Sequence, residues 1–223
     1  MAEALCPRAD PGQTALAGPA SAFDAEAVTA VPDRFEIVLP DWLRERVAEP
    51  ISIADQDERM RFVVRLSAAN VAHGTGGPFG AAVFESDGGR LVSVGVNEVA
   101  SAGNSIAHAE IIAIALAEGA GGGYDLGATG EPAHELVSST EPCTMCLGAV
   151  VWSGVWRVVC AARDEDARHI GFDEGPKPAD WVAALEARGI SVVRDVLRAE
   201  AVEVLEGYAS GGGPIYNARQ RGE

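Results

Sequence analysis

The sequence predicts an α/β fold in which a mixed β-sheet is covered by helices on both faces. Short runs of apolar and β-branched residues alternate along the chain with segments whose apolar residues recur at helical spacing. Glycine-rich segments separate these runs, and the sequence contains no internal repeat. Such an alternation of strands and helices is typical of a sheet that lies between two helical layers.

The composition indicates a globular chain with a substantial core. Of its 223 residues, 48% are hydrophobic and 22% are charged. No apolar run reaches the roughly 18 to 20 residues that a membrane span requires. The N-terminus lacks the basic start and the apolar stretch of a signal peptide. We therefore expect a cytoplasmic protein with no membrane partner.

The net charge of -16 argues against a nucleic-acid partner. Proteins that bind a phosphate backbone gain most of their affinity from lysine and arginine. Here acidic residues outnumber basic ones 33 to 17, and the C-terminal NARQRGE is too short to form a basic track. A small, weakly charged substrate fits this composition better.

The chain begins with two segments that precede the predicted core. Residues 1–33 are rich in alanine, glycine, proline and serine, and they predict a flexible tail. Residues 34–50 carry a compact apolar cluster and predict an arm that docks on the core or on another subunit. We expect residues 34–223 to form a single domain that includes this arm.

Helices and strands then follow one another. A helix is predicted from Asp55 to about His73, where residues 74–78 end it. Strands over 79–85 and 91–99 flank an Asp87-Gly88-Gly89 turn, which is a hairpin signal. The remaining predicted elements are helices over 107–118, 143–153, 179–188 and 199–209 and strands over 135–139, 156–162 and 190–196.

Two short stretches hold the residues that can bind a metal, SIAHAE at 105–110 and SSTEPCTMC at 138–146. In the first stretch we expect His108 in the first turn of a helix, with Ser105 as the helix cap. Glu110 lies two residues further on, so its side chain points to another side of the same turn. It can therefore reach an open position of the metal without being a ligand.

The second stretch opens a helix with a cysteine pair. Pro142 suits the first helical turn, where its missing N–H costs nothing. Cys143 and Cys146 are three residues apart and share one face, and a helix N-terminus lowers thiol pKa values. One nitrogen and two sulfur ligands leave one tetrahedral position open, which is typical of a catalytic zinc. Zinc brings the pKa of its bound water to about 7, and Glu110 would act as general base and then general acid.

A C-x-x-C pair alone is also compatible with a structural zinc site or a redox pair. Pro142 before the first cysteine and the matching His-x-Glu disfavour the redox interpretation. A structural zinc would need a fourth ligand, for which His73 and His134 are the free histidines nearby in sequence. Together the two stretches match the signature of zinc deaminases, and so they predict a hydrolytic deamination.

The chain resembles the cytidine-deaminase superfamily and, within it, bacterial guanine deaminases of the cytidine-deaminase fold. The resemblance covers about residues 50–218, and residues 1–33 lie outside it. HAE and EPCTMC define the superfamily, and the C-x-x-C spacing differs from that of the riboflavin-pathway deaminases. GFDEGP and the aromatic C-terminal tail point to the guanine branch. Further matching stretches are GGPFGAAVFE, GVNEV, CAARDED and IYNAR.

This resemblance implies a three-layer α/β/α fold with a five-stranded mixed sheet, and a homodimer. It implies one Zn²⁺ per subunit, held by His108, Cys143 and Cys146. It also implies Glu110 as the proton shuttle and Asn97 as a residue that binds the base.

The resemblance extends to the C-terminal part of the chain. Glu174 resembles a second acidic residue that orients the purine and shares in proton transfer. The segment over about 211–223 is expected to be a lid that closes over an active site, its own or the neighbour's, with Tyr216 in the comparable place. We also expect Ala109 to contact the substrate.

The loop that contains Asp173 and Glu174, here called the acidic loop, gives a physical reason to expect guanine. The Watson–Crick edge of guanine offers two adjacent donors, which a carboxylate such as Asp173 or Glu174 can accept together. Cytosine and adenine present a ring acceptor there, which an ionised carboxylate repels. Asn97 can pair with a ring nitrogen elsewhere on the base. Phe79 and Trp152 are candidate walls of a flat apolar slot, or else ordinary core residues.

The predicted function is therefore the zinc-dependent deamination of free guanine to xanthine and ammonia. Aminotriazines such as ammeline share the donor-rich edge of guanine and are an alternative, and cytosine or cytidine is a weaker one. Deaminases of tRNA adenosine share HAE and PCxxC, but the charge of -16 argues against that substrate. An alternative of another class is a zinc-binding protein without catalysis.

Overall fold

The structure is a computed structural model that describes residues 34–219. The chain divides into two units, Met1–Glu36 and Ile37–Glu223, and all helices and strands named below belong to the second. The tail predicted over residues 1–33 lies outside the described residues, as do the last four residues of the predicted lid segment.

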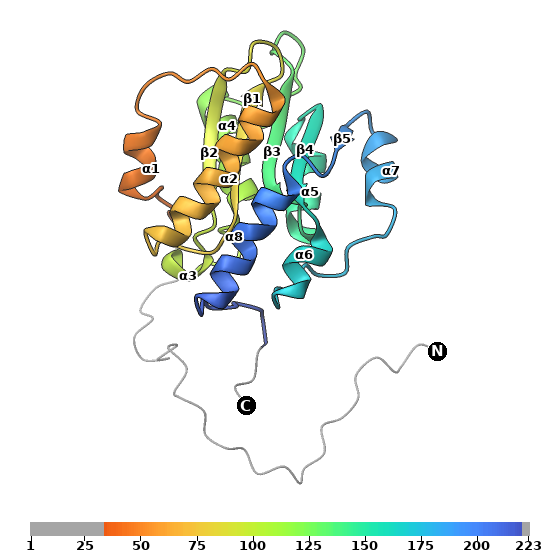
Figure 1. The fold of residues 1–223 in the computed structure, drawn as a ribbon. Helices are drawn as coiled ribbons and strands as arrows, with labels where there is room; N and C mark the ends of the chain where they lie inside the picture. Colours follow the sequence, from red (N-terminus) through yellow and green to blue (C-terminus); the bar gives the residue numbers. More distant parts are fainter. Residues whose placement is uncertain (1–33, 220–223) are drawn as a thin grey trace. The chain divides into compact units, whose positions relative to one another are not determined.

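The described chain forms a five-stranded mixed sheet in the order β2-β1-β3-β4-β5 (Figure 1). β1 pairs antiparallel with both β2 and β3, whereas β3 with β4 and β4 with β5 are parallel. The predicted five-stranded mixed sheet is thus confirmed. The strands are β1 (Gly80–Glu85), β2 (Leu91–Val96), β3 (His134–Thr140), β4 (Arg157–Ala162) and β5 (Ser191–Val193).

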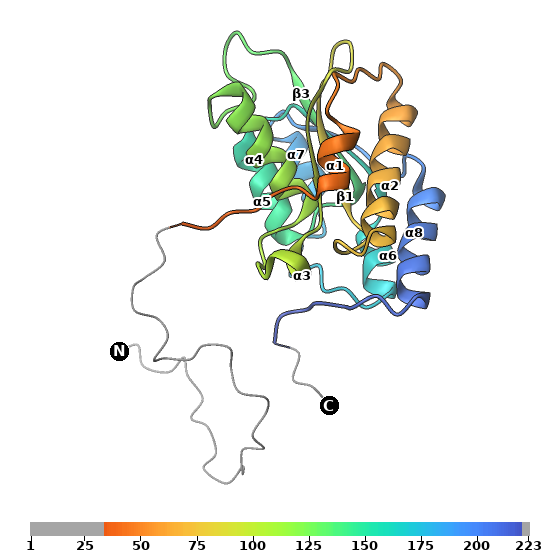
Figure 2. The ribbon, with the colours of Figure 1, turned by 90° about the vertical axis from the view of Figure 1, so that its left-hand side faces the viewer.

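Helices cover both faces of this sheet (Figure 2). One face packs against α2 (Gln56–Ala72) and α8 (Arg198–Ser210). The other packs against α4 (Ala109–Gly121), α5 (Thr144–Ser153) and α7 (Trp181–Glu186). Successive residues of a strand point to opposite faces, so each strand contributes to both apolar cores. The predicted three-layer α/β/α arrangement is confirmed.

Three short helices differ from the sequence prediction. They are α1 (Asp41–Arg46), α3 (Val99–Ala102) and α6 (Asp164–His169). Four to six residues are too few to display a helical period, so no pattern in the sequence indicates them. The second strand also ends earlier than predicted, because α3 begins at Val99.

Helix α1 lies within the segment that the sequence predicts as a docking arm. Its Leu43 is fully buried in the core that contains α2. The Trp42 ring stacks on His73 at the end of α2, with 5.0 Å between the ring centroids. The Trp42 indole N–H also donates to the Thr75 hydroxyl at 3.0 Å. These contacts hold the segment against the carboxyl end of α2.

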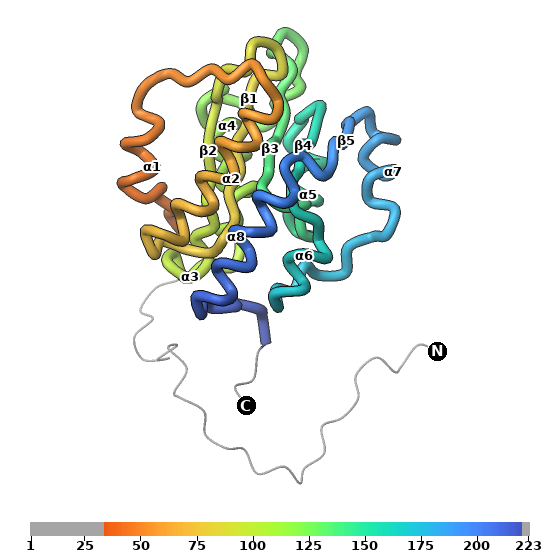
Figure 3. The backbone as a smooth tube through the Cα atoms, viewed as in Figure 1, coloured from red at the N-terminus to blue at the C-terminus, as the bar shows by residue number. Residues whose placement is uncertain are grey.

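Segments that are far apart in the sequence come together at one end of the sheet. Helix α3, the end of α6 and the tail that follows α8 all lie at this end (Figure 3). In α/β sheets, the carboxyl ends of parallel strands are the usual place for a ligand site. Within residues 34–219, no helix has both the length and the apolar character that crossing a membrane requires.

Candidate active site and metal centre

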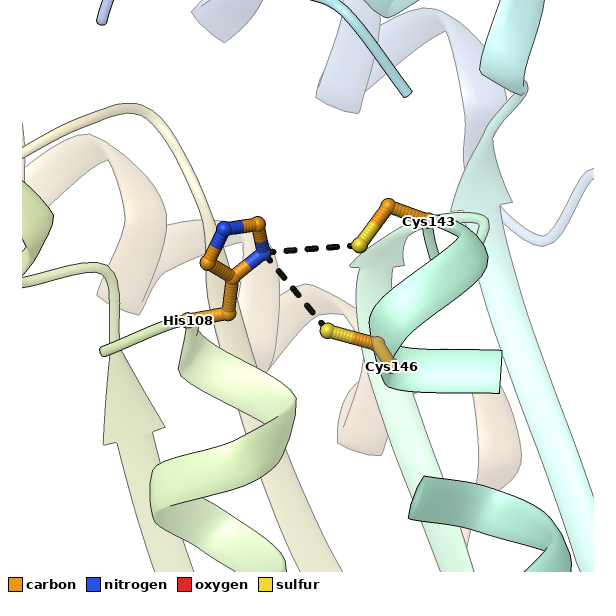
Figure 4. A group of neighbouring side chains, drawn as sticks. All are labelled: His108, Cys143 and Cys146. Atoms are coloured by element: carbon orange, nitrogen blue, oxygen red, sulfur yellow. Dashed lines mark hydrogen bonds between the residues drawn. The ribbon is translucent and has the colours of Figure 1, made fainter. Parts of the chain in front are cut away.

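His108, Cys143 and Cys146 form a compact group of possible metal ligands (Figure 4). The His108 Nδ1 atom lies 3.6 Å from the Sγ atom of each cysteine. With Zn–N bonds of about 2.1 Å and Zn–S bonds of about 2.3 Å, tetrahedral geometry places nitrogen and sulfur ligands about 3.6 Å apart. The donor set and its spacing therefore fit one Zn²⁺.

Both ligand-bearing helices begin later than predicted, α4 by two residues and α5 by one. His108 is the N-cap residue of α4, and Cys143 is the N-cap residue of α5; both have an extended backbone. The prediction that Ser105 caps α4 is therefore wrong, and Ser105 lines the cavity beside the metal group instead. Pro142 likewise lies before α5 rather than in its first turn. Neither N-cap side chain is used to cap its helix, so the imidazole and the first thiol stay available to a metal.

The two thiols have very different pKa values. A hydrogen bond from Cys146, together with the nearby His108, lowers the pKa of Cys143 to about 4. The same hydrogen bond, together with burial, raises the pKa of Cys146. One proton thus leaves the pair readily, and a bound cation favours the loss of the second. Burial raises the pKa of the core thiol Cys160 to about 12, so this thiol is inert.

Glu110 lies directly beside the metal group. It is the second residue of α4, and its side chain is buried, with the residue only 6% exposed. Its carboxylate accepts hydrogen bonds from the Ser138 hydroxyl and the Cys146 thiol, each at 3.4 Å. Burial and the neighbouring Cys143 raise the pKa of Glu110. Such a carboxylate, poised next to a metal ligand, is suited to proton transfer.

A cavity of about 210 Å³ opens over the metal group and joins it to the predicted substrate residues. Its size suits a small molecule. Among the predicted residues, those that line it are Phe79, Asn97, His108, Glu110, Cys143, Asp173, Glu174 and Tyr216.

One predicted substrate contact is wrong. Trp152 is 83% exposed, because it lies six residues after Cys146 in α5, about 240° further around the helix. It therefore cannot form a wall of this cavity. The Ala109 side chain is fully buried in the core on the α4 side of the sheet, and a contact of Ala109 with the substrate stays a prediction.

The wall expected from Trp152 is formed by Phe172. This residue is buried, and its ring lies 4.9 Å from that of Phe79 in an edge-to-face arrangement and 5.0 Å from that of Tyr216. Sequence reasoning missed it, although it belongs to the GFDEGP stretch that carries the resemblance.

Asp173 and Glu174, in the acidic loop after α6, differ in exposure and in role. Glu174 is 7% exposed, and burial, assisted by Cys143, raises its pKa to about 8. The side chain of Asp173 is 65% exposed, and its carboxylate accepts the Gly175 N–H at 2.9 Å. Asp173 thus shapes the turn, whereas Glu174 presents a carboxyl group within a buried setting.

The C-terminal tail contacts this loop through Asn217, which the sequence reasoning did not single out. The Asn217 carboxamide oxygen accepts the Asp173 N–H at 2.8 Å, and its nitrogen donates to the Gly171 carbonyl at 2.8 Å. Asn217 itself lines the cavity. The tail and the acidic loop are therefore joined by two hydrogen bonds from one side chain.

Two hydroxyl groups that line the cavity have no hydrogen-bond partner among residues 34–219. They belong to Thr140, the last residue of β3, and to Tyr216 in the tail. Buried hydroxyls are nearly always hydrogen-bonded, so both point to a polar ligand. A Cβ atom at Gly77 would lie 2.2 Å from the Tyr216 hydroxyl oxygen, so a residue without a side chain is required there.

Asn97 is held in a fixed orientation at the rim of the hairpin. Its backbone N–H donates to the Phe79 carbonyl at 3.0 Å, and its backbone carbonyl accepts from the Asn70 side chain at 2.9 Å. Its side-chain oxygen accepts the Val99 N–H at 3.3 Å. These bonds place the carboxamide beside the aromatic wall.

Comparison with known proteins bears on this site. A model of the cytidine and deoxycytidylate deaminase zinc-binding region matches residues 54–162. A guanine deaminase of Bacillus subtilis (strain 168) is 37% identical over 115 residues, which are 52% of this chain and 69% of the relative. A probable cytosine deaminase of Schizosaccharomyces pombe is 32% identical over 82 residues, but the match spans only 51% of that relative and 34% of this chain.

Solved structures extend the likeness to nearly the whole described chain. A guanine deaminase from Nitrosomonas europaea is 48% identical, with a TM-score of 0.78 over 81% of this chain and 99% of the other. A structure solved in complex with 2,6-diaminopurine is 50% identical, with a TM-score of 0.79 over 84% of this chain and 98% of the other.

Fold and metal centre together define a zinc-dependent deaminase. The chain belongs to the cytidine and deoxycytidylate deaminase family. Within that family it is similar to bacterial guanine deaminases, which confirms the predicted resemblance.

Proposed function

We propose that the chain hydrolyses free guanine to xanthine and ammonia. The observation that supports this proposal is the small cavity in which the His-Cys-Cys group and Glu110 face a second buried acid, Glu174. The His-Cys-Cys group and Glu110 account for hydrolytic deamination. Glu174 accounts for the choice of a base with adjacent donors.

His108, Cys143 and Cys146 would hold the zinc ion, which lowers the pKa of a bound water to about 7. Glu110 takes the proton of the attacking water and delivers it to a ring nitrogen of the base. Glu110 then takes the second proton of the water from the added hydroxyl and passes it to the amino group on the attacked carbon, whose C–N bond breaks as ammonia leaves. The balance is one guanine and one water to one xanthine and one ammonia.

Glu174 selects the base and shares in moving its protons. Because burial raises its pKa to about 8, an empty cavity favours its neutral form at pH 7. Two N–H donors of guanine favour the carboxylate instead and so lower its pKa on binding. A base with a ring acceptor at this position gives no such stabilisation.

The remaining walls hold the base in place. Phe79 and Phe172 bound it on the apolar side, and Asn97 contributes a donor and an acceptor. The hydroxyls of Thr140 and Tyr216 gain partners from the polar atoms of the bound base. The tail around Tyr216 acts as a lid over the cavity.

We also propose an oligomeric state, a partner class and a location for the chain. We expect a homodimer, since the large aromatic rings of Trp152 and Trp156 are exposed, as is common where another subunit docks. The charge of -16 supports the absence of a nucleic-acid partner. We further propose a single catalytic domain that begins at residue 34, and a cytoplasmic location.

Substitution Glu110→Gln tests the reaction type. The variant should keep one zinc per chain, because Glu110 is not a ligand, and should lose about 10²- to 10⁴-fold in kcat, because it cannot transfer protons. Zinc is measured by metal analysis and turnover by ammonia release. A normal rate in this variant would contradict the assignment.

Ammonia release from guanine, guanosine, adenine, cytosine, cytidine and ammeline tests the substrate. Guanine should be the best substrate of this panel. Strong turnover of another base with none of guanine would replace the substrate and leave the chemistry in place. One bound zinc with no ammonia from any compound would favour a zinc-binding protein without catalysis.

A further inference from the structure

We infer that Thr144 is a positioning residue that fixes Glu174 relative to the metal-ligand helix. This inference rests on the proposed function, in which Glu174 contacts the base. Thr144 stands directly after Cys143 and is the first residue of α5. Its backbone N–H and its hydroxyl both donate to the backbone carbonyl of Glu174, each at 3.1 Å.

Two donors from one residue to one acceptor restrict that carbonyl more tightly than a single hydrogen bond does. Thr144 and Glu174 are 30 positions apart in the sequence, so this contact joins two otherwise separate parts of the site. The backbone of Glu174 is thereby fastened to the turn that carries Cys143 and Cys146. Motion of the acidic loop relative to the metal ligands is restricted at its central residue.

The residue after Glu174 is adapted to this contact. Gly175 has a positive φ of 71°, and a Cβ atom there would lie 3.0 Å from the Thr144 hydroxyl oxygen. A side chain at this position would press against the hydroxyl and would strain the backbone. The glycine therefore permits the close approach of the loop to Thr144.

Other residues hold the outer side of the same loop. The Arg168 guanidinium donates to the Gly175 carbonyl at 2.7 Å, and Asn217 bonds Asp173 and Gly171. Arg168 lies on α6 and Asn217 in the tail. Thr144 alone among these anchors belongs to the helix of the two cysteine ligands, so it sets the distance between Glu174 and those ligands.

The hydroxyl of Thr144 should therefore affect catalysis through Glu174. Reacting groups must be held within roughly 0.5 Å, and a displacement of about 1 Å can lower a rate by up to about 10²-fold. A hydroxyl that serves only to start α5 or to support the metal ligands would act independently of the Glu174 carboxylate. The two roles differ in what happens when that carboxylate is removed.

The test compares Thr144→Val, which removes the hydroxyl at nearly constant shape, with Thr144→Ser, which keeps it. Each is made in the wild-type chain and in a Glu174→Gln background. We expect Thr144→Val to lower kcat/KM for guanine by about 10-fold with one zinc still bound, and Thr144→Ser to stay within about two-fold of wild type. In the Glu174→Gln background, Thr144→Val should change the rate by less than about two-fold, since no carboxylate remains to be positioned.

Loss of zinc in Thr144→Val, an equal loss of rate in both backgrounds, or no loss in either would overturn the inference. A readout that does not depend on turnover is amide hydrogen exchange of loop residues 171–175. Exchange should be faster in Thr144→Val than in wild type and Thr144→Ser, and equal exchange in all three would also overturn it. A wild-type chain that does not deaminate guanine but shows these exchange differences would refute the proposed function and leave the positioning role standing.

Discussion

The two ends of strand β3 hold buried carboxylates in opposite surroundings. At the amino end, Glu135 is fully buried and paired with two arginines, with Arg59 at 2.5 Å and Arg157 at 3.4 Å. Beside the carboxyl end, Glu110 and Glu174 are also buried but line a cavity. Among the residues of 34–219 that line this cavity, none is a lysine or arginine.

The presence or absence of arginine partners distinguishes the structural carboxylate Glu135 from Glu110 and Glu174 at the cavity. Arg59 also donates to the carbonyls of Ile53 and Ala54, at 2.7 and 2.8 Å, so it ties the segment before α2 to the sheet. Near the cavity, two further cations, Lys177 and Arg194, are both bound to Glu141. Charge is thus compensated at Glu135 and Glu141, whereas Glu110 and Glu174 lack an arginine or lysine partner and have raised pKa values that suit proton transfer.

Substitution Arg59→Met should have the largest effect on stability. It leaves Glu135 buried with only the longer Arg157 contact, and breaking a buried pair from one side costs about 3–5 kcal/mol in the free energy of unfolding. Urea denaturation of zinc-loaded protein at pH 7 measures this loss. The rate of ammonia release per folded, zinc-loaded chain should stay unchanged.

The double variant Arg59→Met with Glu135→Leu is the matched control. It removes both charges, so much of the lost stability should return. A loss below about 1 kcal/mol in the single variant would show that the clamp at the amino end is dispensable, and the comparison between the two ends would fail.

The reactive end was the more predictable part of this molecule. His108 and Glu110 lie two residues apart and Cys143 and Cys146 three, so helical geometry alone brings each pair to one turn. The sheet and its long helices follow from apolar periodicity, which is why the predicted elements match within a few residues. The residues that carry the chemistry lie in two short stretches, and such local patterns can be recognised in a sequence.

The parts that the sequence did not predict depend on contacts between distant segments. Thr144 and Asn217 gain their roles only when the acidic loop folds back on α5 and the tail folds over that loop. Trp152 was misplaced because an aromatic residue in a short helix shows no preference in sequence for the cavity or for the surface. Phe172 was overlooked because a single phenylalanine between a glycine and two acids forms no pattern.

Substitution Glu174→Gln should have an intermediate effect that depends on pH. The folded chain keeps the Glu174 proton up to a pKa of about 8, whereas the unfolded chain loses it near 4.5. Between these values the unfolded state binds fewer protons, so the parent loses stability as the pH rises. In metal-free protein the variant should be roughly 4 kcal/mol more stable than the parent at pH 8 and nearly equal to it near pH 4.5.

Thermal or urea unfolding of parent and variant at pH 4.5, 6 and 8 measures this difference. Zinc adds a positive charge near Glu174, which favours the carboxylate, so the difference should shrink when zinc is bound. A stability difference that does not change with pH would mean that Glu174 is ionised throughout, and its burial would then not distinguish it from Glu135.

The smallest effect is expected at Glu98, which separates burial from function. This residue is 5% exposed, one of its carboxylate oxygens has no hydrogen-bond partner among residues 34–219, and burial raises its pKa to about 7. Unlike Glu174, it does not line the cavity. Because its folded pKa is also raised above the unfolded value, Glu98→Gln should stabilise the chain by roughly 3 kcal/mol at pH 8 and very little at pH 4.5. Its kcat/KM should stay within about two-fold of wild type. Burial raises the pKa of a carboxyl group whether or not that group contacts a substrate, so a raised pKa alone does not identify a catalytic residue. A loss of rate in Glu98→Gln as large as that in Glu174→Gln would instead place Glu98 in the catalytic site.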